Sequence, residues 1–507
     1  MMIIASTTLL IPLLAASASA SGDTLTLDLS QAILLALDES HSAQVLDLSL
    51  AGAEHDVAAA KGRFGARADA RFSLPELEEG VQRVQVPGDL PRYDSYGSRE
   101  VSAILQLSQP LPTDGEVSLS GHLYQQDDSY YDQASEQTQE QRTFFNSYEV
   151  SLRQPLFTPN ELKLGLEKAE IGHRLARRAY QRGQLDLSFQ VTAAFYMLVE
   201  AQEELAIARD ALERQQQNFD LAKRKYNAGL IPEVEALQME VDLAGASNDL
   251  LGRESDLILS ADRFRLLVGL PMVQPIRAEA NLTPGIFEVD HGLALSHALA
   301  HRTEINDIQD RIRSSEITVT ETNARSHLKG ELSAFYNLTG ISDPLLEDTG
   351  MGDLVESSWE DLKRRPGNRG VRFSLSVPLW DSGVNKQEVA SAEVAVRRRL
   401  LDEEDLHRDI ARQVQATLAE FEGAKRRLDV LGRSLDIALR SYGISRQRFE
   451  AGDITSQALA DNRDRLVQAR RSYLAAFVSY RLSGADLRRQ TLYDFELGKS
   501  LVEGAGE

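Results

Sequence analysis

Apolar residues recur at helical spacing over most of the chain, and this pattern predicts long amphipathic helices. Residues 160–226 and 384–449 contain no proline, and their apolar positions follow the 3.6-residue period throughout. A continuous helix over 160–226 would extend about 100 Å at 1.5 Å per residue. Each long segment ends at an Ala-Gly turn, and a second helical segment follows at 232–268 and at 455–490. We therefore predict two long helical hairpins.

The period changes from 3.6 to 2 after two shorter predicted helices at 29–66 and 290–326. Ala68–Leu74 and Glu331–Leu338 alternate between apolar and polar residues. Each is followed by a polar loop rich in Gly and Asp and by a returning strand that leads into a long helix. Alternating strands of about 9–11 residues are typical of membrane β-barrels. Soluble β-sandwiches have the same alternation, so this pattern alone leaves both architectures open.

The long helices belong to a repeat. Ser151–Phe157 (SLRQPLF) returns as Ser374–Trp380 (SLSVPLW), and Tyr226–Ile231 (YNAGLI) returns as Phe449–Ile454 (FEAGDI). The two copies are 223 positions apart at both landmarks, so they align without a gap. Long helices accept insertions badly, because one extra residue rotates everything after it by about 100°. The ungapped repeat therefore predicts two equivalent helices packed in a common register.

The two copies differ in the length of their strand regions. The first copy has 39 more residues than the second between its opening Ala-Leu pair and its strand-to-helix proline. This extra length contains two alternating segments, 101–107 and 116–121, around a Pro112–Gly115 turn, and it reads as an additional hairpin. The hairpin either joins the other strands or lies apart from them, and the sequence leaves this open.

Composition limits the compartment and the partners. The net charge of −22 argues against a nucleic-acid partner, which would need clustered Lys and Arg, although solubility alone also accounts for that charge. Residues 1–20 form an apolar run that ends in Ala-Ser-Ala, and we expect a signal peptide cleaved after Ala20. No later segment contains 18 consecutive apolar residues. The chain has no cysteine, which excludes disulfides, thiolate metal sites, a cysteine nucleophile and an N-terminal lipid.

No catalytic constellation is evident, and we predict no catalytic, cofactor-binding or metal-binding residue. The HExxH, P-loop and GxSxG motifs are all missing from the sequence. His407-Arg408-Asp409 has three letters of a kinase loop, but it lies within a predicted helix. His297 and His301 are one helical turn apart and could share a metal, yet no third ligand accompanies them, which favours an ordinary solvated helix face. The chain is therefore predicted not to be an enzyme.

These features together resemble the TolC family of trimeric outer-membrane channel proteins over essentially the whole chain after the signal sequence. The resemblance lies in the export signal, the two tandem copies of helix–strand–loop–strand–helix–turn–helix, and the Ala-Leu helix openings at Ala36 and Ala298. It also lies in the Q-P-L-F and V-P-L-W-D-S-G junctions and the Tyr/Phe-x-Ala-Gly-x-Ile turns. Each motif is weak alone, but their order and spacing, twice over, are specific.

The resemblance implies a mainly α-helical fold with a membrane β-barrel portion, a trimeric TolC-like α/β-barrel built from two tandem structural repeats. Three chains would share one barrel in the outer membrane, continued by a long helical barrel across the periplasm. Two strands per copy would give twelve strands in the trimer, and the extra hairpin could raise the number to six strands per chain. The implied divisions are a signal peptide 1–20, a first repeat 21–270, a linker 271–289, a second repeat 290–490 and a C-terminal tail 491–507.

The function implied by the resemblance is an outer-membrane exit channel of a tripartite efflux pump or a type I secretion system. Its expected partners are two further copies of itself, a periplasmic adaptor (membrane fusion) protein and an inner-membrane transporter that supplies the energy; no cofactor and no nucleic acid are expected. The alternative is a soluble periplasmic coiled-coil scaffold, if the strands form a small sandwich. The cargo is left open, as is the choice between efflux and secretion.

The resemblance also implies two kinds of site. The adaptor-contacting tips correspond to Ala228, Gly229, Leu230, Ala451, Gly452 and Asp453. The candidate periplasmic gate comprises Asp461 and, in the first copy, Glu235. Ala458 occupies the position at which the family often has a second carboxylate, so a double ring of carboxylates is in doubt. Ile454 stands where the family can have a pairing arginine, so a salt bridge that locks the gate has no support at this position. A ring of Asp461 would favour cations; the alternative is a solvated helical carboxylate.

Overall fold

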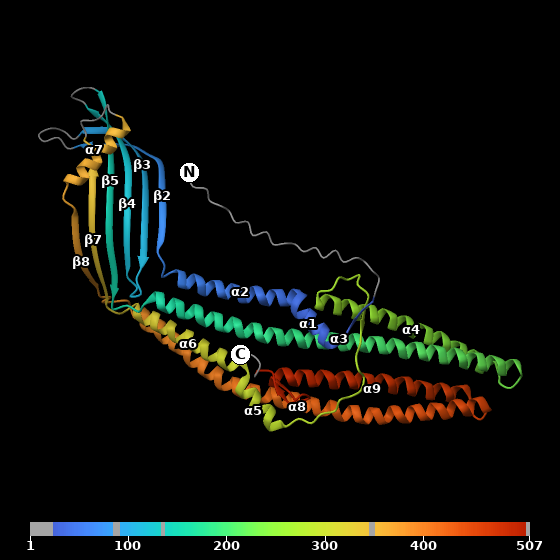
Figure 1. The fold of residues 1–507 in the computed structure, drawn as a ribbon. Coiled ribbons are helices and arrows are strands. Elements are labelled where there is room, and N and C mark those ends of the chain that lie inside the picture. Colours follow the sequence, from blue (N-terminus) through green and yellow to red (C-terminus); the bar gives the residue numbers. More distant parts are fainter. Residues whose placement is uncertain (1–23, 85–91, 133–136, 344–349, 503–507) are drawn as a thin grey trace. The chain divides into compact units, whose positions relative to one another are not determined.

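We describe a computed structural model of the chain over residues 24–84, 92–132, 137–343 and 350–502 (Figure 1). The predicted signal peptide, 1–20, lies outside the described residues. The chain divides into two compact units. The first, called the helical unit here, comprises the chain up to Leu48, Ala179–Thr303 and the chain from His407. The second, called the sheet unit, comprises Ser49–Arg178 and Glu304–Leu406.

The predicted helical hairpins are present. α3 (Glu161–Asn227) is followed by α4 (Glu233–Val268), and α8 (Val384–Ala451) is followed by α9 (Ser456–Thr491). α3 and α8 are 67 and 68 residues long and contribute residues to both units. Both bounds of each of these four helices lie within two residues of the prediction, because apolar periodicity and the turn glycines define the helices locally.

The two shorter predicted helices are each broken, so the prediction of single helices over 29–66 and 290–326 is wrong. The first is α1 (Leu29–Glu39) followed by α2 (His41–Gly62), and the second is α5 (His291–His301) followed by α6 (Thr303–Ala324). Ser40 has extended backbone (ψ 147°), and its hydroxyl accepts a hydrogen bond from the Ala43 N–H (3.1 Å). Such a cap satisfies the start of α2 and competes with a continuous helix.

The helical unit has an aromatic core that includes the inter-repeat linker. Phe195 of α3 packs against Phe264 of α4 with ring centroids 6.2 Å apart. The linker's Phe287 packs against Phe421 of α8 (4.9 Å). The linker also contains β6 (Ile276–Ala278), which pairs in parallel with β1 (Leu25–Leu27). The chain's beginning and the linker are therefore tied together in one unit.

All six long strands form one antiparallel sheet in the sheet unit (Figure 1). The order is β2 (Arg67–Val84), β3 (Arg92–Pro110), β4 (Glu116–Asp132), β5 (Gln137–Leu156), β7 (Lys329–Ile341) and β8 (Asn368–Ser376). The first copy supplies four neighbouring strands and the second copy supplies two. The extra hairpin that the sequence predicted thus belongs to the same sheet. The register of β2 shifts between Ser73 and Glu76, at Pro75, as expected for a residue that cannot donate to the ladder.

A helix replaces part of the loop predicted between the second copy's strands. α7 (Met351–Arg364) packs on the sheet, where the rings of Trp359 and Tyr148 lie 5.6 Å apart. The Asp361 carboxylate accepts a hydrogen bond from the Ile341 N–H (3.0 Å). The prediction of a polar loop was wrong for this segment, because its apolar stripe is short and lies among polar residues. Among the described helices, none is long and apolar enough to cross a membrane.

Candidate gate and docking site at the two helical turns

The two helical turns have the same backbone conformation. Gly229 has a φ of 70° and Gly452 a φ of 88°, in the left-handed region. The N–H of the following residue bonds back to the helix at both turns, Leu230 N to Lys225 O and Asp453 N to Arg448 O (2.9 Å each). This is the Schellman arrangement, in which glycine avoids the penalty that a side chain would incur. A Cβ on either glycine would meet open space, so the backbone angle alone requires glycine here.

All six predicted tip residues are exposed at these turns. The turns differ in chemistry at the position after the glycine, where Leu230 is 72% exposed in the first turn and Asp453 is a carboxylate in the second. The α3–α4 turn therefore presents an apolar side chain and the α8–α9 turn a charged one. The structure places the tips where a partner could reach them.

Direct contacts join the two turns. The Lys225 ammonium donates a hydrogen bond to the Phe449 carbonyl oxygen (2.5 Å) and lies 4.4 Å from the centre of the Phe449 ring. The Ser456 hydroxyl donates to the Glu235 carboxylate (3.1 Å). Both bonds run between the α3–α4 hairpin and the α8–α9 hairpin. The tips are therefore one connected structure within the chain.

A small apolar cluster lies next to these contacts. Its buried members are Tyr442, Phe449, Leu459 and Leu466, and Leu221 of α3 packs against it. Ile454 is among the partly buried residues of this cluster. Ile454 occupies the position at which the family can have a pairing arginine. Its side chain packs inward and cannot form a salt bridge.

The two candidate gate carboxylates have different surroundings. Asp461 is exposed and accepts a hydrogen bond from Gln457 of the preceding helical turn (2.9 Å). Glu235 is half-buried and accepts the bond from Ser456 at the start of α9. Glu235 is therefore engaged in holding the two hairpins together, whereas the carboxylate of Asp461 stays accessible.

Three arginines of α9 connect it to the α3–α4 hairpin, and the sequence analysis missed them. Arg463 donates to Gln215 of α3, and Arg470 donates to Asp210 of α3 (2.5 Å). Arg471 contacts Asp249 of α4 (2.6 Å) and Glu204 of α3 (3.1 Å). Arg463 and Arg470 are seven residues apart, so they lie on one helix face. That spacing was the available signal, but their partners depend on the register between helices.

Asp210 is the most heavily bonded carboxylate of this group. It accepts hydrogen bonds from Arg214 (2.9 Å) and from Arg470. Burial alone would raise the pKa of Asp210, but the bonds and charges of Arg214 and Arg470 outweigh it and hold the pKa below the usual range. Arg214 also lies over the Tyr442 ring, 5.7 Å from its centre. The ionised Asp210 thus joins α3, α9 and the edge of the apolar cluster.

One of the two histidines that could have shared a metal, His297, is hydrogen-bonded to the C-terminal segment. The ring nitrogens of His297 lie 2.8 Å from the Thr491 carbonyl oxygen and 3.1 Å from the Ser500 hydroxyl. These bonds attach α5 to the segment with β9 (Tyr493–Asp494) and β10 (Lys499–Ser500). Within the described parts of the chain, no three His, Asp or Glu side chains are grouped so that they could hold a metal. His297 therefore anchors the C-terminal segment.

Comparison with known proteins identifies what this architecture is similar to. The sequence model of a family described as outer membrane efflux protein matches residues 116–270 and 351–491, which is more than half of the chain. A comparison with curated proteins finds no match.

Among solved structures, the chain is similar to the CmeC outer membrane channel of Campylobacter jejuni, with a TM-score of 0.66 and 12% identity over 94% of this chain and 88% of that one. It is similar to the outer membrane protein VceC of Vibrio cholerae, with a TM-score of 0.63 and 15% identity over 93% and 96% of the two chains. It is also similar to the open-state MtrE outer membrane channel of Neisseria gonorrhoeae, with a TM-score of 0.63 and 13% identity over 92% of this chain and 89% of that one. These likenesses confirm the predicted fold class.

Proposed function

The chain belongs to the outer membrane efflux protein family, and on that premise we propose that it assembles as a homotrimer with a periplasmic adaptor and an inner-membrane transporter. The family match carries this proposal. The chain is an outer-membrane channel that conducts cargo passively, and it is not an enzyme. The alternative of a soluble periplasmic scaffold gains no support from the family or from the structures that the chain resembles.

The proposed divisions of the chain follow its two repeats. We assign 1–20 to the signal peptide, 21–270 to the first repeat, 271–289 to the linker, 290–490 to the second repeat and 491–507 to the tail. The turn from α9 into β9 and the bond from His297 to Ser500 support a C-terminal segment that docks on the protein, at least up to β10. The pairing of β1 with β6 supports a linker that stabilises the first repeat.

The exposed turns are proposed as the adaptor's docking points. Ala228, Gly229 and Leu230 offer an apolar tip, and Ala451, Gly452 and Asp453 offer an acidic one. Their shared Schellman backbone presents the two tips in the same way, and their exposure supports access by a partner. An adaptor that fits both tips would need an apolar contact for Leu230 and a cationic or hydrogen-bonding contact for Asp453.

The gate is proposed to lie at Asp461, with Glu235 in a supporting position. The exposed Asp461 carboxylate would form a ring of three in the trimer, and such a ring attracts cations. Glu235 would act through Ser456 by holding the start of α9 against the α3–α4 hairpin. Opening would then require α9 to exchange the partners of Arg463, Arg470 and Arg471.

The function is tested by expressing the full chain with its natural adaptor and transporter in cells that lack them. Outer-membrane fractions should contain a trimer that dissociates on heating, and the cells should accumulate less of a fluorescent dye or a toxic cargo. The matched control is the same strain without this channel but with both partners. A monomer found in the soluble periplasmic fraction would contradict the channel function.

A further inference from the structure

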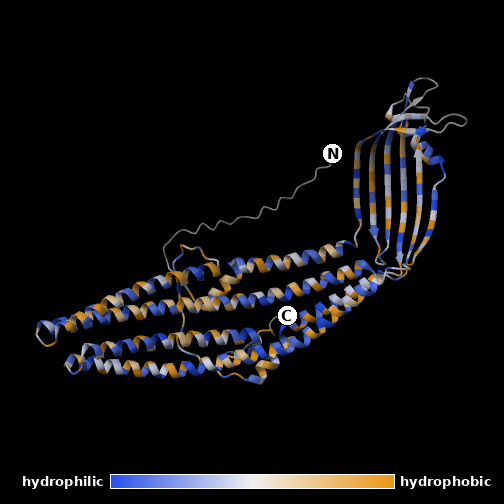
Figure 2. Cartoon of the chain, turned by 180° about the vertical axis from the view of Figure 1, so that it is seen from behind, coloured by the Kyte–Doolittle hydropathy of each residue, from blue (hydrophilic) through white to orange (hydrophobic). Residues whose placement is uncertain are grey.

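One face of the six-stranded sheet is apolar across every strand, including the two strands that the second copy lacks. The register places Ala70 opposite Leu105, Leu107 opposite Leu119, Leu119 opposite Val150 and Ala334 opposite Val371. Directly opposed residues of neighbouring strands share one face. Figure 2 shows the alternation of hydrophobic and hydrophilic residues along all the strands. The extra hairpin therefore continues the apolar face without a break.

The opposite face is polar and is bonded from strand to strand. The hydroxyls of Ser118 and Ser151 are 2.7 Å apart, joining β4 to β5. The Arg153 guanidinium pairs with the Glu331 carboxylate (2.8 Å), joining β5 to β7. Asp69 stands opposite Gln106 in the register of β2 and β3. A sheet with one lipid-compatible face and one hydrated face is what a membrane barrel requires, and β2, β3 and β4 meet this requirement as fully as the others.

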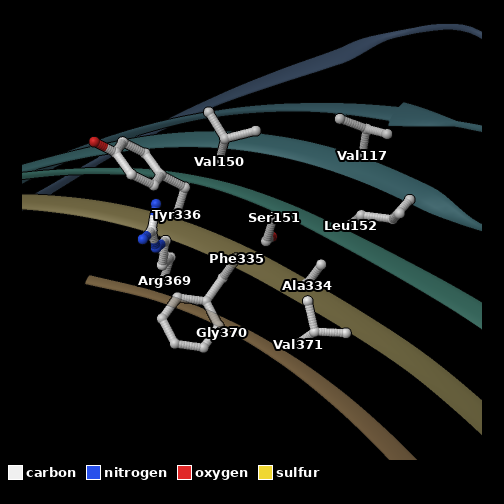
Figure 3. A pocket seen from close by; sticks show the side chains of 10 residues that line it. All are labelled: Val117, Val150, Ser151, Leu152, Ala334, Phe335, Tyr336, Arg369, Gly370 and Val371. Atoms are coloured by element: carbon white, nitrogen blue, oxygen red, sulfur yellow. The ribbon is translucent and has the colours of Figure 1, made fainter. Parts of the chain in front are cut away.

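The apolar face has no covering element over its middle in the described part of the chain. A depression of about 560 Å³ lies on this face, lined by side chains from four neighbouring strands that include Val117, Val150, Leu152 and Val371. Figure 3 shows these side chains. Leu105 is 55% exposed and Val371 is 78% exposed. Soluble proteins rarely leave such a continuous apolar surface open. Lipid is the occupant that fits it.

Aromatic residues lie at both ends of this apolar face. Trp380 follows β8 by a few residues and is 87% exposed, and Phe157 holds the equivalent position after β5. At the other end, Trp359 of α7 packs against Tyr148. Membrane barrels carry aromatic girdles at both interfaces, because amphipathic rings prefer the headgroup level. These rings lie beside β5 and β8 and support the interpretation that these two strands extend from one membrane interface to the other.

The sheet ends at two strands that have a partner on one side only. Among the described strands, β2 pairs with β3 and β8 pairs with β7, and neither has another neighbour. Backbone polar groups inside a membrane must be paired, which requires a closed sheet. Six strands are fewer than the eight or so of the smallest known membrane barrels, so other copies must supply the remainder.

We propose that the membrane portion is an eighteen-stranded barrel, in which β2 of each copy pairs with β8 of the next. The number rests on the homotrimer proposed above, because three copies of six strands make eighteen. A trimer in which each repeat contributed two strands would have twelve. At equal strand tilt and spacing, the eighteen-stranded barrel is about 1.5 times as wide and has about twice the cross-sectional area. The outer end of the duct would then admit bulkier cargo, such as large amphiphiles or unfolded polypeptide.

The cysteine-free chain allows a direct test by labelling. Leu105→Cys and Leu119→Cys, on the apolar face of β3 and β4, should react with a membrane-permeant maleimide and resist a charged, water-soluble one in intact outer membranes. Gln106→Cys and Ser120→Cys, on the polar face of the same strands, should react with the water-soluble reagent. Val150→Cys and Ser151→Cys on β5 give the reference pattern. Rapid water-soluble labelling of both Leu105→Cys and Leu119→Cys, with the β5 pattern intact, would place the extra hairpin outside the membrane and overturn the proposal.

The closure is tested on the same full-length trimer. Pairs of cysteines, one in β2 at Ala68, Ala70 or Phe72 and one at Val371 of β8, should form disulfides between chains, with linked trimers as the largest product. Polymers added to the extracellular side of single channels should be excluded at a radius about 1.5-fold larger than in a variant that lacks residues 85–136. Linked dimers as the largest product, with a native mass of two chains, would overturn both the eighteen strands and the proposed homotrimer. A trimer without any β2–β8 link at any tested pair would overturn the barrel closure alone.

Discussion

Arg470 of α9 donates a hydrogen bond to Asp210 of α3, which also accepts bonds from Arg214 of its own helix. This three-residue group connects the last helix of the second repeat to the long helix of the first. All three residues belong to the helical unit, so the connection lies within one compact body. In the proposed function, this connection helps to hold the gate at Asp461 closed.

Replacing Arg470 with alanine should loosen α9 and favour the open channel. The variant removes a charge-assisted hydrogen bond, for which a loss of about 1.5–3 kcal/mol is typical. We expect a rise of about tenfold in open probability in planar bilayers. Arg433→Ala is the matched control, since Arg433 is exposed and pairs with Asp429 of its own helix (2.7 Å). Equal behaviour of the two variants would show that Arg470 does not restrain the gate.

The stability of the helical unit should fall in acid through Asp210. The pKa of Asp210 is below its ordinary value in the folded chain, so its contribution is complete above the unfolded value of about 3.9 and is lost as the pH falls through the lowered folded value. Asp210→Asn should have a lower melting temperature than the wild type at pH 6. Its melting temperature should then fall less than that of the wild type between pH 6 and pH 3. Circular dichroism of the purified trimer measures both. A wild-type acid loss that is unchanged in Asp210→Asn would exclude this carboxylate as its source.

Two glycine substitutions in α8 and its turn should have opposite effects. Gly452→Ala forces a side chain into the left-handed region (φ 88°) and should destabilise the protein by about 1 kcal/mol. Gly443→Ala, nine residues earlier inside α8, has open space for a Cβ and should stabilise by about 0.5–1 kcal/mol. Denaturant unfolding of the helical signal compares them. If Gly452→Ala is neutral or stabilising, the turn relaxes into another conformation in solution.

The Asp461 carboxylate should set the cation preference of the channel. Asp461→Asn removes three charges from the trimer, and we expect the reversal potential in a salt gradient to move toward the unselective value. Asp464→Asn is the control, because Asp464 is also exposed but pairs with the neighbouring Arg463 (2.7 Å). If the selectivity changes only in Asp464→Asn, then Asp464 and not Asp461 sets the cation preference.

Sequence reasoning succeeded where the structure is determined by local periodicity. The bounds of α3, α4, α8 and α9 follow from apolar spacing and from Gly229 and Gly452, all of which can be read along the chain. The prediction of a continuous helix failed at Ser40, where a single side-chain cap outweighs the helical pattern. The prediction of a loop failed at α7, because its short stripe of apolar residues lies in a polar segment. Sequence reasoning left the extra hairpin undecided, because strand alternation does not specify which strands are neighbours.

The contacts of the candidate site were the least predictable part. Arg463, Arg470 and Arg471 are ordinary helix residues until the register of three helices is known. Glu235 was identified from its equivalence to a gate position, but its bond to Ser456 depends on how the two turns lie side by side. The roles of Asp461 and of the six tip residues in gating and docking stay predictions.

The bonds between the two turns have a thermodynamic consequence. Lys225 reaches across to Phe449, and Glu235 reaches across to Ser456, so displacing one turn changes the free energy of the other. If opening the channel breaks these bonds, a partner that binds the displaced turns more tightly must also promote opening. The converse also holds: a mutation that favours opening must raise that partner's affinity, because more of the protein is already in the state that the partner prefers. Affinity for the adaptor is thus a readout of the gate that needs no electrical measurement.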